Sequence, residues 1–204
     1  MINDSLNKTI TLINNFYDSC KVGHEGSKGY RKSTDLVKLS GCIQELLSLG
    51  FIKLGRTIFA DLGCADGRVN VIMSYVVRKS IGIEIDSEIL SEFTPRKEAL
   101  LVELRKKNLV LLPDNIALFQ GDSLETSMYQ RTRAVVGIRF SDIDLFYTYL
   151  TLHDLFAEKI AAEAKKGALY MVYGFNKILP HYQGLQLLIP DVASKGIAAL
   201  YLKE

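Results

Sequence analysis

A turn with two glycines, flanked by carboxylates, is the strongest chemical signal in this sequence. Asp61 ends a short apolar run, and the chain then turns through Gly63 and Gly67 into a helical pattern. Glu84 and Asp86 follow about 20 residues beyond the turn, the spacing at which an open α/β sheet presents a carboxylate to the hydroxyls of a ribose. Glycines at such a turn allow tight backbone torsions and let a ligand approach the main chain closely. The stretch therefore predicts a site for a nucleotide-like ligand.

The turn differs from the dinucleotide fingerprint G-x-G-x-x-G. Ala65 stands at the middle glycine position, and Arg68 and Val69 follow the last glycine, so no third glycine is in register. Because the glycines of that fingerprint provide the tight turn and the close approach of the pyrophosphate, NAD is a weak prediction here. Glycine turns in α/β folds also occur without any ligand, so a purely structural turn is a further interpretation.

Strand and helix patterns alternate on both sides of the turn. Short apolar runs predict strands at residues 58–61, 80–86, 116–120, 144–150, 168–174, 185–189 and 197–202. Apolar residues at helical spacing predict helices at residues 4–19, 36–47, 69–77, 87–93, 96–107 and from 152 onward. This alternation predicts an α/β fold with a doubly wound, mainly parallel, Rossmann-like seven-stranded sheet and an N-terminal helical extension. The carboxyl ends of its strands would meet in one crevice.

Capping signals mark where several of these helices begin. Ser33 or Thr34 is predicted to cap the second helix. A later helix is expected to be interrupted and restarted at Pro95, with the preceding threonine as its new cap. Thr151-x-x-Asp154 resembles a capping box and predicts another helix start.

Two segments carry a weaker pattern. Residues 22–34 are rich in glycine and polar side chains and are predicted to form a loop or a lid over a site. Residues 123–142 are longer than an ordinary connection, and the run RAVVGIRF within them fits either an extra strand or a flap. We expect residues 1–50 to form N-terminal helices and the lid, and residues 51–204 to form one compact ligand-binding unit.

Composition narrows the class of protein. The 204 residues fit one domain, and 25 Lys+Arg against 23 Asp+Glu leave no overall field that would favour nucleic acid or a membrane surface. RNA binding is unsupported by this balance, although it stays open. Cys20, Cys42 and Cys64 lack metal or disulfide spacing, and the three histidines form no ligand pattern, so no metal site is predicted. Without a membrane-spanning run or a signal-peptide core, the protein is expected to be soluble and cytoplasmic.

The order of the motifs resembles the archaeal and mitochondrial protein-lysine branch of the class I adenosylmethionine-dependent methyltransferases. Members of that branch carry a Pro-Thr entry, DLGxGDGR, GIEID, a strand ending in GD, and ADVVxxYL. This chain has YRKST, DLGCADGR, GIEID, QGD and IDLFYTYL in the same order, over about residues 30–175. It departs from the family at Ser33, which replaces the proline, at Ala65, which replaces the central glycine, and in the long segment before Asp144.

The resemblance implies S-adenosyl-L-methionine as the cofactor. It places Asp61, Gly63 and Gly67 on the methionine and ribose side of the pocket, Glu84 at the ribose hydroxyls and Asp122 near the adenine amino group. The implied cofactor-binding residues are Asp61, Gly63, Cys64, Ala65, Gly67, Glu84, Ile85, Asp122 and Ser123, with Asp66 and Asp86 as lesser candidates. Structural alternatives exist for each acid: Asp61 could orient the turn, Glu84 could be a solvated strand end, and Asp122 could cap a helix.

The methyl acceptor is less defined than the cofactor. A methyl group on a sulfonium is already activated, so the reaction needs positioning more than acid–base groups. The strand DLFYTYL lacks the [ND]PP[YF] pattern of enzymes that methylate adenine or glutamine amides, which disfavours DNA. The resemblance implies a protein lysine, while a small molecule or a catalytically idle role as an adenosylmethionine-binding partner protein remain alternatives. Tyr149 is the predicted catalytic residue, lining the acceptor channel, unless it is a core tyrosine like Tyr147 on the same strand face.

Overall fold

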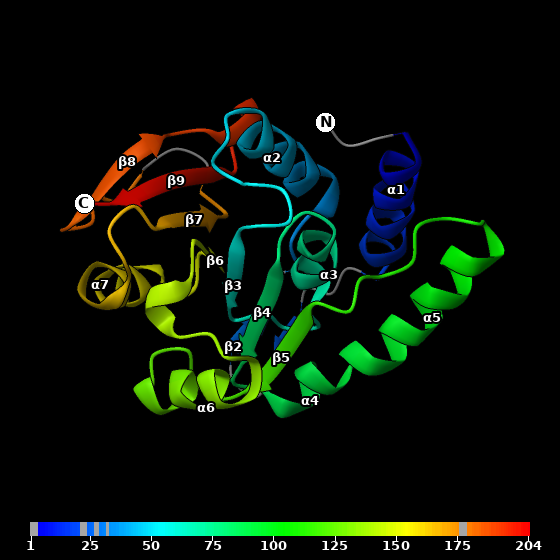
Figure 1. The fold of residues 1–204 in the computed structure, drawn as a ribbon, viewed down its shortest axis with the longest axis horizontal. Helices are drawn as coiled ribbons and strands as arrows, with labels where there is room; N and C mark the ends of the chain where they lie inside the picture. The colour runs from blue at the N-terminus through cyan, green and yellow to red at the C-terminus, as the bar shows by residue number, and fades with distance from the viewer. Residues whose placement is uncertain (1–3, 21–23, 27–28, 32, 176–178) are drawn as a thin grey trace.

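A seven-stranded sheet forms the centre of the computed structural model, which describes residues 4–20, 24–26, 29–31, 33–175 and 179–204 (Figure 1). The strands lie in the order β5-β4-β3-β6-β7-β9-β8. Their bounds are β3 (Ile58–Leu62), β4 (Lys79–Glu84), β5 (Ile116–Gln120), β6 (Leu145–Tyr149), β7 (Leu169–Tyr173), β8 (Leu185–Ile189) and β9 (Ala198–Lys203). β9 pairs antiparallel with β7 and β8, and the other neighbours pair parallel. The predicted α/β fold with a mainly parallel sheet is confirmed.

Helices cover both faces of this sheet. The helices are α1 (Asp4–Asp18), α2 (Leu36–Ser48), α3 (Arg68–Ser74), α4 (Ser87–Ser91), α5 (Phe93–Lys106), α6 (Thr126–Val136) and α7 (His153–Glu163). The residues of β3 alternate between two cores, as the pleat of a strand requires. Phe59 packs with α1, α2, α3 and α5, whereas Ile58 and Ala60 pack with α6 and α7. α1 and α2 thus share a core with the sheet, and the predicted division near residue 50 stays a prediction.

The predicted lid contains two short strands. β1 (His24–Gly26) and β2 (Gly29–Arg31) pair antiparallel as a separate two-stranded sheet. The interpretation of residues 22–34 as a loop was therefore wrong for these strands, while the alternative of a lid stays a prediction. The other residues of that segment before residue 33 lie outside the described part of the chain. Backbone pairing forms this hairpin, and a glycine-rich polar pattern does not reveal it.

The N-cap of α2 lies after both of the residues that were predicted to cap this helix. Asp35 is the N-cap, with its carboxylate accepting a hydrogen bond from the Lys38 backbone N–H at 3.0 Å. The prediction of Ser33 or Thr34 as the cap was wrong, because an aspartate in the next position satisfies the first-turn donor. The hydroxyl of Thr34 is thereby left for another partner.

Two further helix starts differ from prediction in their caps. The interruption near Pro95 is confirmed, but the prediction of Thr94 as the new cap was wrong. α5 already begins at Phe93, and Glu92 joins it to α4. Pro95 then lies in the first turn of α5, where backbone N–H groups have no acceptor within the helix, so its missing N–H costs no hydrogen bond. α7 starts after Leu152, which has a left-handed φ of 53°, and it has no side-chain cap, so the Thr151–Asp154 capping box was also wrong.

The long segment after β5 is helical. α6 ends at Val136, and Gly137 caps it with a left-handed φ of 73° and a hydrogen bond from its N–H to the Arg133 carbonyl. A short 3-10 turn follows at Phe140–Asp142. RAVVGIRF is therefore the end of a helix and this turn, and neither a strand nor a flap. The buried Met128, Tyr129 and Thr132 supply the core-facing side of α6 at helical spacing. No helix in the described part of the chain is long and apolar enough to cross a membrane.

Candidate functional site

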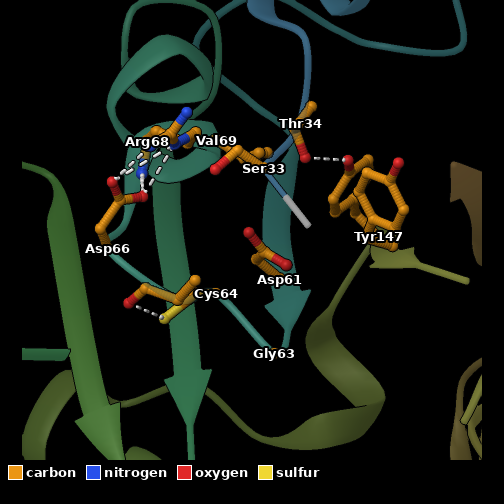
Figure 2. A pocket seen from close by; sticks show the side chains of 11 residues that line it. Ser33, Thr34, Asp61, Gly63, Cys64, Asp66, Arg68, Val69 and Tyr147 are labelled. Atoms are coloured by element: carbon orange, nitrogen blue, oxygen red, sulfur yellow. Dashed lines mark hydrogen bonds and ion pairs between the residues drawn. The ribbon is translucent and has the colours of Figure 1, made fainter. Parts of the chain in front are cut away.

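A narrow cleft opens at the carboxyl ends of β3 and β6 (Figure 2). The connections from β3 and β6 lead to opposite sides of the sheet, so this is the switch point where open α/β sheets bind ligands. The cleft encloses about 330 Å³ of empty space, part of it open to solvent. Its lining residues are Ser33, Thr34, Asp61, Gly63, Cys64, Ala65, Asp66, Arg68, Val69, Tyr147 and Tyr149.

The glycine turn forms the floor of the cleft. Gly63, Ala65 and Gly67 all have left-handed backbone torsions, with φ of 105°, 47° and 73°. The backbone N–H groups of Gly63 and the next residue both donate to the Ile83 carbonyl at 2.9 Å, which fixes the turn to β4. A Cβ at Gly67 would lie 2.8 Å from side chains of β5 and α5, so both its torsion and its packing require glycine.

Asp61 projects a buried carboxylate into this cleft. Only 2% of the residue is exposed, and its Oδ1 has no hydrogen-bond partner among the described residues. Burial raises the pKa of this carboxyl well above its usual range, and the neighbouring Glu84 and Asp66 raise it further. Figure 2 shows the side chain pointing into the space between Ser33 and Tyr147. An unpaired buried acceptor of this kind is suited to a ligand that brings hydrogen-bond donors or a positive charge.

Glu84 lies behind the turn and does not line the cleft. Its two carboxylate oxygens accept hydrogen bonds from the backbone N–H groups of Ala65 at 2.8 Å and Asp86 at 2.9 Å. Asp86 in turn caps α4. Ile85 between them follows the end of β4 and is 47% exposed.

Asp122 and Ser123 follow β5 and lie outside the cleft lining as well. The Asp122 carboxylate accepts a hydrogen bond from the Leu124 backbone N–H at 2.8 Å, as in a turn. Ser123 is buried, and its carbonyl accepts from the Tyr129 hydroxyl at 2.7 Å. Of the predicted site residues, the cleft therefore brings together Asp61, Gly63, Cys64, Ala65 and Tyr149. The others, which are Gly67, Glu84, Ile85, Asp122 and Ser123, lie outside its lining.

A buried ion cluster beside the turn was missed at the sequence level. The Arg68 guanidinium binds the Asp66 carboxylate at 2.8 Å, and Arg96 pairs with the same carboxylate. Arg68 also donates to the carbonyls of Tyr17 and Cys20 at 3.3 and 3.4 Å, so it ties the turn to the C-terminal end of α1. The spacing of Asp66 and Arg68 was visible in the sequence, whereas nothing there linked either residue to Arg96.

Two tyrosines of β6 form the wall opposite the turn. The Tyr147 hydroxyl lies 2.9 Å from Thr34 Oγ1, and burial followed by the nearby Asp61 raises the pKa of this phenol well above its ordinary value. Tyr149 lines the cleft at the strand end, with its ring centroid 5.3 Å from that of Tyr173. Tyr149 was predicted as the catalytic residue that lines an acceptor channel, and that role stays a prediction. Thr34 had been predicted only as a helix cap.

The described part of the chain contains neither a metal-binding cluster nor a disulfide. No cluster of three or more His, Cys, Asp or Glu side chains could hold a metal ion among these residues. Cys64 faces the cleft as a free, buried thiol, and burial, followed by the charge of Asp61, raises its pKa well above the ordinary value. The thiol therefore stays protonated and is a poor nucleophile.

Comparison with known proteins identifies similar folds but no sequence relatives. No protein-family model and no curated protein sequence matches the chain. A putative O-methyltransferase from Klebsiella pneumoniae has a TM-score of 0.54 at 11% identity, covering 99% of this chain and 90% of that one. A putative methyltransferase from Escherichia coli has a TM-score of 0.52 at 14% identity, covering 85% and 87%.

An RNA methyltransferase from Salinibacter ruber, in complex with S-adenosyl-L-homocysteine, has a TM-score of 0.51 at 15% identity and covers 80% of this chain and 90% of that one. At such identities the similarity concerns the fold. The chain has the α/β fold and mostly parallel seven-stranded sheet of these class I methyltransferase structures.

Proposed function

We propose that this protein is an S-adenosyl-L-methionine-dependent methyltransferase. The observation that carries the proposal is the buried, unpaired Asp61 carboxylate at the switch point of the sheet, beneath the glycine turn. The donor's methionine end carries an ammonium group, which supplies both the charge and the hydrogen bonds that this carboxylate lacks. The similarity in fold to methyltransferases, one of them in complex with S-adenosyl-L-homocysteine, supports the same class of ligand.

The remaining cofactor contacts follow the predicted assignment. The backbone of Gly63, Cys64, Ala65 and Gly67 would pass along the methionine and ribose, because the turn offers main chain without bulky side chains. Glu84 would exchange one of its present backbone bonds for the ribose hydroxyls. The exposed Ile85 offers an apolar surface for one face of the adenine, with Asp122 and Ser123 at its rim.

We further propose that the acceptor is the amine of a protein lysine. Tyr147 and Tyr149 give the cleft an aromatic wall, which suits the apolar stem and the amine of a lysine side chain. Arg68 is the one cation among the described lining residues, and it is bound to Asp66, so it is a poor partner for a phosphate. The bound donor supplies an activated methyl group, and this chain supplies alignment.

Ligand binding tests the first proposal directly. Isothermal titration calorimetry with S-adenosylmethionine, S-adenosylhomocysteine and NAD should show binding of the first two and none of NAD. Binding of NAD without either adenosyl ligand would refute the assignment.

The acceptor can be tested with radiolabelled donor and two extracts, one of total protein and one of metabolites. A lysine acceptor predicts label in protein that survives ribonuclease, disappears with protease and yields methyl-lysine after acid hydrolysis. Label in the metabolite fraction would identify a small-molecule enzyme. Donor binding without any transfer would favour the non-catalytic partner protein.

Tyr149 is the residue that we propose to align the acceptor. Tyr149→Phe removes one hydroxyl hydrogen bond, worth about 0.5–1.5 kcal/mol, and should lower turnover roughly two- to tenfold. Donor affinity and melting temperature should stay at wild-type values. If turnover is unchanged, or falls only together with stability, Tyr149 is a structural residue.

A further inference from the structure

Hydroxyl groups line the wall of the cleft that faces Asp61. Thr34 comes from the segment before α2 and Tyr147 from β6, and Figure 2 shows both beside the Asp61 side chain. Their hydroxyl oxygens are 2.9 Å apart, and the residues are only 5% and 1% exposed. Two segments separated by more than 100 residues therefore place two hydroxyls together at one point of the cleft.

One of the two hydroxyl hydrogens of this pair is not used in the bond between the two residues. Each hydroxyl carries one hydrogen, and the bond between Thr34 and Tyr147 uses one of the two. The second hydrogen can be donated to a ligand whichever of the two groups donates in the mutual bond. A buried hydroxyl without an acceptor is unfavourable, so the pair is suited to an acceptor that enters the cleft.

The two sides of the cleft therefore have opposite hydrogen-bonding character. Asp61 offers an unpaired acceptor oxygen, and the Thr34–Tyr147 pair offers a donor. The amino-acid end of a ligand has the matching arrangement. Its ammonium, which donates hydrogen bonds, and its carboxylate, which accepts them, are attached to the same carbon atom. Thr34 also directly precedes Asp35, the cap of α2, and the N-terminal end of a helix favours a negative group.

We propose that the Thr34–Tyr147 hydroxyl pair binds the α-carboxylate of the methyl donor, opposite the ammonium held by Asp61. The inference rests on the proposed donor and adds the contacts that distinguish its amino-acid end from a plain adenosyl thioether. The first-turn N–H groups of Leu36 and Lys38 already bind Asp18 and Asp35. The carboxylate contact is thus made by the hydroxyls.

A set of three ligands and four proteins tests this contact by calorimetry. The ligands are S-adenosylhomocysteine, its decarboxylated analogue, and 5′-methylthioadenosine, which lacks the whole amino-acid end. Wild type should prefer S-adenosylhomocysteine to the decarboxylated analogue by ten- to hundredfold, as expected for a hydrogen bond to a charged group. Thr34→Val should lose most of that preference, and Thr34→Ser should keep it.

Two further variants sharpen the assignment. Tyr147→Phe keeps the ring but removes the partner of Thr34, and it should lose the preference in the same way. Thr148→Val is the matched control, because Thr148 is a buried threonine of the same strand whose hydroxyl donates to the Leu62 carbonyl at 3.2 Å, away from the cleft lining. It should keep the wild-type preference.

The outcomes separate this inference from the donor assignment. If wild type binds S-adenosylhomocysteine and its decarboxylated analogue equally, the carboxylate site is wrong and the donor assignment stands. The same holds if Thr34→Val and Tyr147→Phe both retain the preference. If wild type binds none of the three ligands, the proposed function itself is refuted. The wild-type comparison needs no variant, so it decides even if a substitution unfolds the protein.

Discussion

Asp61 and Asp66 are two buried carboxylates of the same glycine turn, and the protein surrounds them in opposite ways. Asp66 is fully buried and binds two arginines, Arg68 and Arg96. Asp61 is almost as buried, yet Oδ1 of its carboxylate has no partner among the described residues. Burying a carboxylate is costly unless it is paired, so the paired Asp66 fits a structural role, whereas the unpaired Asp61 fits the ligand contact that we propose.

The largest effect should come from removing the paired carboxylate. Asp66→Ala leaves Arg68 buried without its ion pair and loosens the contact with α1, which should lower the free energy of unfolding by about 3–5 kcal/mol. Urea denaturation measures this loss. Glu103→Ala, which breaks an exposed ion pair with Lys106, is the control and should leave stability unchanged. If both variants are equally stable, Asp66 has no special structural role.

Glu84 is intermediate between the ion-paired Asp66 and the unpaired Asp61. Its oxygens accept from the backbone N–H groups of Ala65 and Asp86, so it has hydrogen-bond partners but no opposite charge among the described residues. We expect Glu84→Ala to weaken donor binding by ten- to hundredfold, because a buried hydrogen-bonded carboxylate contributes about 1–3 kcal/mol. Calorimetry with S-adenosylhomocysteine measures the change. Loss of stability with unchanged affinity would group Glu84 with Asp66 and move the ribose contact elsewhere, for example to Asp86.

Removing the charge of Asp61 should have opposite effects on binding and on stability. Its pKa is raised by burial in the folded state, so the unfolded chain releases this proton at lower pH than the folded protein does. The free energy of unfolding therefore falls as pH rises from about 4 toward the folded-state pKa. Asp61→Asn lacks this penalty and should be more stable than wild type at pH 7, by on the order of 1 kcal/mol.

The same variant should bind the donor less tightly, because the ammonium loses its counter-charge. Unfolding measured from pH 4 to 8 should show the stability difference between wild type and Asp61→Asn growing with pH. A variant that is less stable than wild type at pH 7 would show that Asp61 is a structural carboxylate like Asp66.

This contrast also shows what could be predicted from the sequence. The strand that ends near Asp61 and the glycines after it were predicted correctly, because apolar runs and glycine turns are local patterns. The pairing of Asp66 with Arg96 and of Thr34 with Tyr147 depends on contacts across 30 and 113 residues. Such contacts exist only once the sheet order brings the segments together, so a single sequence contains no local sign of them.

The errors in local structure have a different cause. RAVVGIRF was interpreted as an extra strand or a flap, because the segment that contains it is longer than an ordinary connection. The buried side of α6 lies at Met128, Tyr129 and Thr132, further toward its start. Tertiary packing overrode the local propensity there. The cap of α2 was misplaced by one residue because Thr34, Asp35 and Ser33 are all good caps, and their choice depends on what else binds them.

The middle of the turn, finally, should matter least. Ala65 replaces the glycine of the resembling family and has a left-handed φ of 47°, which costs a residue with a Cβ roughly 1–2 kcal/mol. Ala65→Gly removes that strain but makes the unfolded chain more flexible by about 0.4–1 kcal/mol, so the net gain should be within about 1 kcal/mol. Its N–H would still bind Glu84, so donor affinity should change by less than about threefold, an energy below 1 kcal/mol. Thermal melting and calorimetry on this variant check both numbers. A large loss of affinity would mean that the methyl group of Ala65 contacts the donor. The centre of the turn would then contribute to donor binding as much as the carboxylates at its two ends.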